Sequence, residues 1–476
     1  MTRGKKLGIL SLLLLGAMGA AVAALIIFQE EAETQEDTAV TIFTLDSDQV
    51  TALSWTYDGE TMRLEKDGQT QWTYPEDGAF PLDQSYPDAM VGALREIQAE
   101  KTIENVEDLA EYGLADPVCA ITVETGEEHQ LAIGNETGLG GQRYLSIGDG
   151  NVYLVEAGLL DSFALGLYDL VETETIPDMS DVSGFQITAG DETLDVEYLE
   201  ESGLAYSDQY TWFWKQGKEY TALDTEETEA LLQQVTGLNW ESCVDYRANQ
   251  ETLGSYGLLQ PSATVTVSYT ETAQVATNET DEDGNPIYET QETDKTFTLE
   301  LGDYDGASCY ARLAGSTMVY RVDGALCDAL LAATGESLLP QDVIRLDWSK
   351  VTGMEIQLDG QTYTLEKTVQ EETDEEGNTT ETYVYQQNGK TVEITDTLDQ
   401  LQDMEPIDTV AGARGKQREL ALTFYQDSER YPQVELVFYQ YDSGSCLVGL
   451  NGETRLLVDR DSLLEIIETL RELLTE

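Results

Sequence analysis

Carboxylates are the side chains with the widest chemical potential in this 476-residue sequence, where 92 Asp and Glu stand against 25 Lys and Arg. Paired carboxylates can hydrolyse glycosides. Among so many acids, however, some pair falls at a suitable separation by chance, and nothing selects one pair over another. We therefore predict no catalytic residue. The formal net charge of −67 also opposes nucleic-acid binding, because it repels phosphate.

Two acidic stretches, 280–285 and 373–378, resemble the first half of a calcium-binding loop. The twelfth position of such a loop carries a glutamate, but here it would be Thr290 or Tyr383. Alternating, strand-like residues flank both stretches. The sequence therefore predicts two polar hairpin tips, with weak contact to a divalent cation as the alternative. No metal ligand is assigned.

The single histidine, His129, lies beside Glu127 and Glu128. A Ser-His-Asp site would have to use it, but no nucleophile elbow is present, so we predict an exposed turn histidine. No Gly-Lys pair closes a phosphate-binding loop before a helix. The glycine-rich run 138–141 leads into another strand, which predicts a hairpin loop, with a ligand-contacting loop as the alternative. No cofactor is predicted.

An aromatic run at 210–214 places Trp212 and Trp214 on one face of a predicted strand. A core strand explains this pattern, and a platform for carbohydrate or peptide is the alternative. The five cysteines form no C-x-x-C pair. Cys309 and Cys327 are the nearest in sequence, and both a disulfide and two buried thiols remain open for them.

Residues 7–28 form an uncharged stretch long enough to span a bilayer as one helix. Arg3, Lys5 and Lys6 precede it, whereas all 92 acids follow it. The positive-inside rule then puts the N-terminus in the cytoplasm. We predict a cytoplasmic basic tail (1–6), a single-pass transmembrane anchor in the cell membrane (7–28), an acidic linker (29–43) and an extracytoplasmic body. A cleaved signal peptide is the alternative.

The extracytoplasmic body repeats itself, beginning with three similar phrases. These are Val50-Thr51-Ala52-Leu53, Val182-Ser183-Gly184-Phe185 and Val351-Thr352-Gly353-Met354. Alternating runs with Asp-Gly or Asn-Gly turns follow each phrase and predict hairpins. Amphipathic spacing, as at Met90, Leu94 and Ile97, then predicts a short helix covering one face of a sheet.

A second internal match is Tyr112-Gly113-Leu114-x-x-Pro117, which returns at Tyr256-Gly257-Leu258-x-x-Pro261. The strands that follow also correspond, at 131–135 and 299–303. The predicted fold is α+β: an N-terminal transmembrane helix followed by three repeated modules of antiparallel β-meanders with short packing helices. Their predicted ranges are 44–178, 179–343 and 344–476, and the last copy is degenerate because it lacks the Tyr-Gly-Leu phrase.

The anchor, the acidic juxtamembrane stretch, the opening phrases and the motif at Glu111 to Pro117 together resemble a bacterial family of domains of unknown function, numbered 4340. This resemblance implies a membrane-anchored, repeat-containing envelope protein that is often encoded beside ABC-type transporter components. It implies no active site, so no functional residue is carried over.

Three functional hypotheses follow from the sequence and the resemblance. The first is a non-enzymatic, membrane-anchored extracytoplasmic scaffold or accessory protein, associated with an ABC-type transport complex or other envelope proteins. The second is a surface binding module for polysaccharide, peptide or divalent cation. A carboxylate-dependent hydrolase is the weakest of the three.

Overall fold

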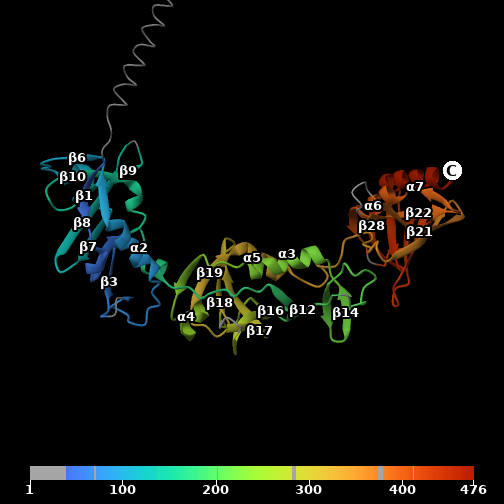
Figure 1. Cartoon of the computed structure of the whole chain (residues 1–476), viewed down its shortest axis with the longest axis horizontal. Helices are drawn as coiled ribbons and strands as arrows, with labels where there is room; N and C mark the ends of the chain where they lie inside the picture. Colours follow the sequence, from blue (N-terminus) through green and yellow to red (C-terminus); the bar gives the residue numbers. More distant parts are fainter. Residues whose placement is uncertain are drawn as a thin grey trace, which may run out of the picture. The chain divides into compact units, whose positions relative to one another are not determined.

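Figure 1 shows the computed structural model of the chain, which describes residues 39–68, 71–138, 140–200, 202–280, 286–373, 379–410 and 412–475. The chain divides into two compact units, of which the first ends at Glu174 and the second spans Thr175–Glu476. The predicted basic tail, the anchor and the linker up to residue 38 lie outside the described residues. Within the described ranges, no helix is long and apolar enough to span a bilayer.

The first unit is built on an eight-stranded sheet with the order β4-β3-β2-β7-β8-β9-β10-β6, accompanied by a two-stranded sheet of β1 and β5 and by helix α2. The strands are β1 (Val40–Thr44), β2 (Ala52–Tyr57), β3 (Glu60–Lys66), β4 (Trp72–Thr73), β5 (Glu96–Ala99), β6 (Lys101–Ile103), β7 (Cys119–Glu124), β8 (Glu128–Glu136), β9 (Gln142–Ser146) and β10 (Val152–Glu156). Helix α2 is Ser85–Leu94.

The second unit contains two nine-stranded sheets. The first has the order β14-β13-β12-β11-β16-β17-β18-β19-β15. Its elements are β11 (Asp181–Ala189), β12 (Glu192–Tyr198), β13 (Trp212–Gln216), β14 (Glu219–Ala222), α3 (Thr225–Thr236), β15 (Ser242–Asp245), α4 (Gln250–Ser255), β16 (Ala263–Thr280), β17 (Pro286–Tyr304), β18 (Ser308–Leu313), β19 (Val319–Asp323) and α5 (Gly324–Ala332).

The other sheet of this unit has the order β23-β22-β21-β20-β25-β26-β27-β28-β24. Its elements are β20 (Val351–Leu358), β21 (Gln361–Thr373), β22 (Thr379–Gln387), β23 (Lys390–Val392), α6 (Thr395–Gln402), β24 (Pro406–Thr409), β25 (Arg418–Gln426), β26 (Gln433–Gln440), β27 (Ser445–Leu450), β28 (Glu453–Asp459) and α7 (Arg460–Thr475). The described chain is thus β-rich, with antiparallel sheets and few helices.

The three large sheets repeat one strand order, except that two strands precede the central pair in the first sheet and three precede it in the other two. In each, the first strand of one meander pairs with the first strand of the next: β2 with β7, β11 with β16, and β20 with β25. Two meanders therefore form one continuous sheet in every copy. The module boundaries at 178/179 and 343/344 stay predictions, since the chain separates into compact units only after Glu174.

The opening phrase of each copy forms a contact across this central strand pair. The hydroxyls of Thr51, Ser183 and Thr352 each donate to a carbonyl on the partner strand, at 3.2 Å in all three cases. The next residue is small because the neighbouring strand lies close: a Cβ on Gly184 would lie 2.6 Å from the Val196 carbonyl oxygen. The phrase is therefore structural.

The Tyr-Gly-Leu phrase packs against a strand that follows it in each of the first two copies, at residues 131–135 and 299–303. A Cβ on Gly134 would lie 2.3 Å from the Tyr112 carbonyl oxygen, and one on Gly302 would lie 2.1 Å from that of Tyr256. Gly113 and Gly257 have φ of 70° and 72°, the left-handed region that glycine adopts most easily. The two sequence matches are thus the two sides of one contact.

Helix α2 is shorter than the amphipathic spacing predicts. It ends at Leu94, and Ile97 lies in β5, which pairs with β1. Strand burial explains the difference, since Ile97 and Ala99 are buried while Gln98 between them is exposed. Burial alternates from one residue to the next over 96–99, as in a strand, instead of following the period of a helix.

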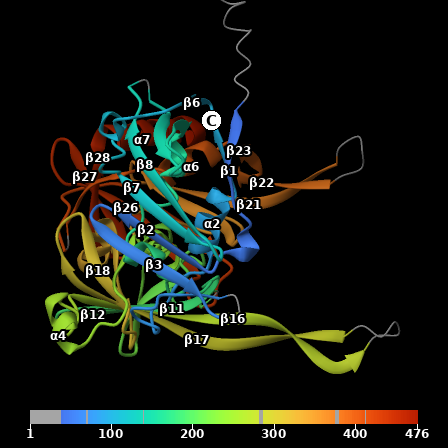
Figure 2. The ribbon, with the colours of Figure 1, turned by 90° about the vertical axis from the view of Figure 1, so that its left-hand side faces the viewer.

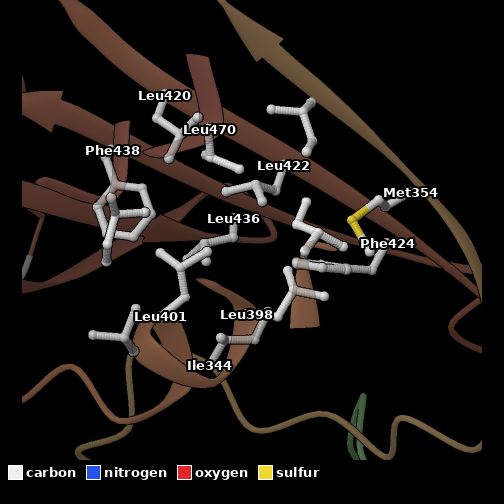
Figure 3. Packing of buried hydrophobic residues seen from close by; sticks show 14 of the residues in the cluster. Ile344, Met354, Leu398, Leu401, Leu420, Leu422, Phe424, Leu436, Phe438 and Leu470 are labelled. Atoms are coloured by element: carbon white, nitrogen blue, oxygen red, sulfur yellow. The ribbon is translucent and has the colours of Figure 1, made fainter. Parts of the chain in front are cut away.

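Helices α3 and α5 cover one face of the first sheet of the second unit, and α6 and α7 cover one face of the other. In the first of these sheets, Leu231 and Val235 of α3 share a hydrophobic core with α5 and with the inward-facing residues of β16 and β17. Figure 3 shows the same arrangement in the other sheet, where Leu398 and Leu401 of α6 and Leu470 of α7 pack near Leu422 and Leu436. The opposite face of the first of these sheets carries a smaller apolar cluster, in which Leu253 of α4 packs with Leu258 and Val319.

Two hairpins extend well past their sheets, as Figure 2 shows for β16–β17 and β21–β22. β11 accompanies β16 only as far as Thr270, and β18 accompanies β17 only from Leu299. Between these points the hairpin is a two-stranded ribbon, here called the β16–β17 ribbon and described for residues 271–276 and 288–293. Residues 281–285 and 374–378, for which the sequence predicts two polar hairpin tips, lie outside the described residues.

Candidate functional site

His129 lies at the start of β8, opposite Val123 of β7. Its Nε2 is 3.1 Å from the Thr125 hydroxyl, and its ring meets Phe43 edge-on with 5.6 Å between the ring centroids. The side chain is partly buried, whereas the sequence predicts an exposed turn residue. The glycine-rich run connects β8 to β9, and Gly140 and Gly141 adopt φ of 75° and 79°, so these residues form a hairpin loop.

The acidic stretches connect paired strands, with Thr280 opposite Pro286 and Thr373 opposite Thr379. The strands that flank each stretch are therefore paired as an antiparallel hairpin, and residues 281–285 and 374–378 themselves lie outside the described residues. In the part of the chain that the structure describes, no group of three or more His, Cys, Asp and Glu side chains is arranged to hold a metal ion.

The aromatic run lies in the core. Trp212 is 3% exposed and Phe213 is fully buried. The indole N–H of Trp212 donates to Glu229 at 3.4 Å, and Trp214 packs so tightly over Gly335 that a Cβ there would lie 2.1 Å from its ring. Trp212 is therefore almost wholly covered by protein, although it also lines a hollow of about 520 Å³ together with Tyr198 and residues of α3.

All five cysteines are buried and free. Cys309 of β18 and Cys327 of α5 form a hydrogen bond with each other, and that bond, together with burial, raises the pKa of Cys327. Burial also raises the pKa of Cys119 to about 12. The raised pKa keeps the thiols of Cys327 and Cys119 protonated at neutral pH, which makes these two poor nucleophiles.

The sequence analysis singled out Tyr210 but not the rest of a segment that makes several long-range polar contacts in the second unit. This segment, here called the clasp, comprises residues 202–210 between β12 and β13. Tyr431 donates its hydroxyl hydrogen to the Leu204 carbonyl at 2.9 Å, and Gln426 donates to the Tyr206 carbonyl at 3.0 Å. Asp208 forms an ion pair with Lys350.

Through these contacts the clasp joins the two sheets of the second unit, and the Tyr206 ring packs against the core of the β20–β28 sheet. In the first unit, the corresponding connection between β3 and β4 spans only residues 67–71. The connection between β12 and β13, residues 199–211, is longer than this, and the extra length is the sequence signal by which the clasp could have been found.

A chain of hydrogen bonds fixes the clasp tyrosines. The backbone N–H of Arg345 donates to the Tyr206 hydroxyl at 3.1 Å, and the hydroxyls of Tyr206 and Tyr210 lie 3.2 Å apart. Tyr210 donates in turn to Asp342 at 3.5 Å, and the Arg345 guanidinium lies 3.0 Å from that carboxylate. Burial raises the pKa of both tyrosines, so both stay neutral.

A cavity of about 300 Å³ opens beside this network. Its wall is mostly apolar, with side chains from the clasp, from β14, from the segment 339–343 and from β27 and β28. Tyr206 borders it and keeps some accessible surface for that reason. The volume is at the lower end of the range found for small-molecule sites.

Arg455 is the cationic residue of the cavity wall, and it occupies an irregular position in β28. Val448 of β27 pairs with Leu456, but the next residue, Gly449, pairs with Thr454, so Arg455 is the extra residue of a β-bulge. The equivalent hairpins β9–β10 and β18–β19 pair without such a shift. Bulges redirect side chains and are frequent beside binding sites.

Comparison with known proteins gives one match. The model of the family described as Domain of unknown function (DUF4340) matches residues 72–247 and 212–422. The two overlapping regions agree with a repeated architecture. No curated protein and no solved structure is detectably similar to the chain.

Proposed function

The chain belongs to the DUF4340 family, and we propose that it is a non-enzymatic, membrane-anchored extracytoplasmic scaffold or accessory protein with an ABC-type transport complex as its partner. The anchor at 7–28 would tether it as a single-pass protein with a cytoplasmic N-terminus. The transporter association comes from the family resemblance alone, so it is the part that most needs an experiment.

The observation that carries a scaffold role is the β16–β17 ribbon. In its described residues neither strand has a second neighbour, so the outer backbone groups are open to a partner strand. Val275 and Tyr288 are 45% and 58% exposed on it. A two-stranded ribbon is marginally stable alone in water, and strand addition by a partner would complete its hydrogen bonding.

Affinity purification from membranes in mild detergent tests the proposal. The full chain should recover transporter subunits. A variant in which an Asn-Gly turn replaces residues 273–291 shortens the ribbon and keeps the pairing of Thr272 with Glu292, and it should recover fewer. As a matched control, shortening the β21–β22 hairpin by replacing residues 369–383 should leave recovery unchanged. Recovery of no subunit by the full chain would remove the transporter association.

The cavity beside the clasp favours a second candidate, a binding module. Its mostly apolar wall distinguishes this cavity from the hollow beside Trp212, whose lining is mostly polar. The binding role and the scaffold role involve different residues, so they can be tested separately.

A further inference from the structure

We propose that the cavity beside the clasp binds a small carboxylate with a compact apolar body, held by Arg455. This inference rests on the second functional candidate and is independent of the scaffold role. It follows from the shape and lining of the cavity, from the position of Arg455 and from the charges around it.

The apolar wall selects an apolar ligand body. Val448, Leu456 and Val343 are buried around the cavity, and Ala205 and Ala222 leave room on the clasp side. At about 300 Å³ the space suits a single ring or a short branched chain rather than a polysaccharide. Removing such a group from water stabilises the complex in proportion to the apolar area buried.

Arg455 supplies the charge. Its guanidinium donates to the Pro340 carbonyl, and among the described residues no carboxylate forms an ion pair with it. An arginine carries five N–H donors in a planar fork that matches a carboxylate. The bulge in β28, which the equivalent hairpins lack, places this side chain in the cavity wall.

The carboxylates and the clasp tyrosines of the wall are already engaged or screened. Asp342 is neutralised by Arg345, which lies 3.0 Å away, and the hydroxyls of Tyr206 and Tyr210 are committed to each other and to Asp342. Glu453 also lines the cavity, but it is exposed, so water and salt screen its charge. Arg455 is therefore the unneutralised charge that a bound ligand would meet, and it selects an anion.

Calorimetric titration of the full chain in detergent tests this site with three probes of similar shape: phenylacetate, phenylacetamide and phenethylamine. Phenylacetate should bind with one site per chain, and the neutral and cationic probes should bind at least about tenfold more weakly, since a charged hydrogen bond is lost. Arg455→Gln should weaken phenylacetate binding by a similar factor.

Two further variants separate the site from general effects. Arg418→Gln removes an exposed arginine outside the cavity wall and should leave binding unchanged. Ala222→Leu fills the cavity and should abolish binding while the melting temperature holds or rises. Equal affinity for all three probes, no detectable binding, or wild-type affinity in Arg455→Gln or Ala222→Leu would each overturn the proposal. Arg455→Gln should also recover the same membrane partners as wild type, so failure of the scaffold role would appear separately.

Discussion

At the scale of single residues, polar side chains in this protein link neighbouring strands. Glu197 of β12 is an example: it pairs with Lys215 of β13 and accepts a hydrogen bond from Tyr220 of β14 at 2.7 Å. One carboxylate thereby links three adjacent strands. The hydrogen bond from Lys215, and then that from Tyr220, lowers the pKa of Glu197 below its ordinary 4.5.

The lowered pKa of Glu197 sets the sign of a pH effect. A carboxylate whose pKa is depressed on folding stabilises the native state above its unfolded pKa and loses that contribution as pH falls through its folded pKa. Glu197→Gln should therefore cost about 1 kcal/mol or less at pH 7, because the pair is partly exposed. The difference from wild type should shrink below about pH 4.5.

Urea unfolding at several pH values, followed in the tryptophan signal, measures this difference. Glu219→Gln is the matched control, since Glu219 is an exposed residue of β14 without a described ion pair. A cost of Glu197→Gln that stays constant down to pH 3 would contradict the linkage.

At the scale of elements, the Tyr-Gly-Leu segment holds the chain against the second meander in the first two copies. Tyr112 packs on Tyr144 with 4.9 Å between ring centroids, and Tyr256 packs on Tyr310 at 4.7 Å. Leu114 and Leu258 are buried beside them. The contact lets the chain return from one sheet edge to the centre.

Gly134→Ala should break this contact in the first unit, because its Cβ would lie 2.3 Å from a backbone oxygen that has no room to move. Overpacking of this kind typically costs about 1–3 kcal/mol. Gly92→Ala is the control: no atom lies within 4 Å of its Cβ position in α2, and alanine there should stabilise the helix. Thermal unfolding compares them, and a Gly134→Ala melting temperature equal to wild type would refute the steric argument.

The same scale shows what sequence reasoning can and cannot reach. Alternation and Asp-Gly turns correctly predict the antiparallel hairpins, because side-chain period and turn chemistry are local. The pairing of β2 with β7 depends on a contact between distant segments, so the sequence left the two meanders separate. The clasp could not be predicted for the same reason. The contacts of its Tyr206 and Tyr210 involve Asp342 and Arg345, which lie more than 130 positions further along the chain.

At the scale of the whole molecule, the charge of −67 is the dominant feature. Ion pairs such as Arg63 with Glu65 and Glu124 offset only a small part of it. Excess like charge destabilises a compact state by self-repulsion. The acids also discourage association between exposed strand edges.

Salt should therefore stabilise this protein. Raising sodium chloride from about 0.02 to 0.5 M shortens the screening distance to a few ångströms, so the melting temperature should rise. Sorbitol at the same osmolality is the control for solvent effects that do not involve charge, and it should give a smaller rise. A fall in melting temperature with salt would show that attractive ion pairs outweigh the repulsion.

The central strand pairing also governs how each copy can fold. The hydroxyl contacts across the central pairs join residues separated by 73, 85 and 73 positions. Hairpins form in microseconds, but strands this far apart in the sequence can pair only after a long loop has closed. Folding is slow when many contacts join such distant residues. During synthesis, β2, β11 and β20 are therefore unpaired edge strands of the first meander until the ribosome has released β7, β16 or β25, with which they pair.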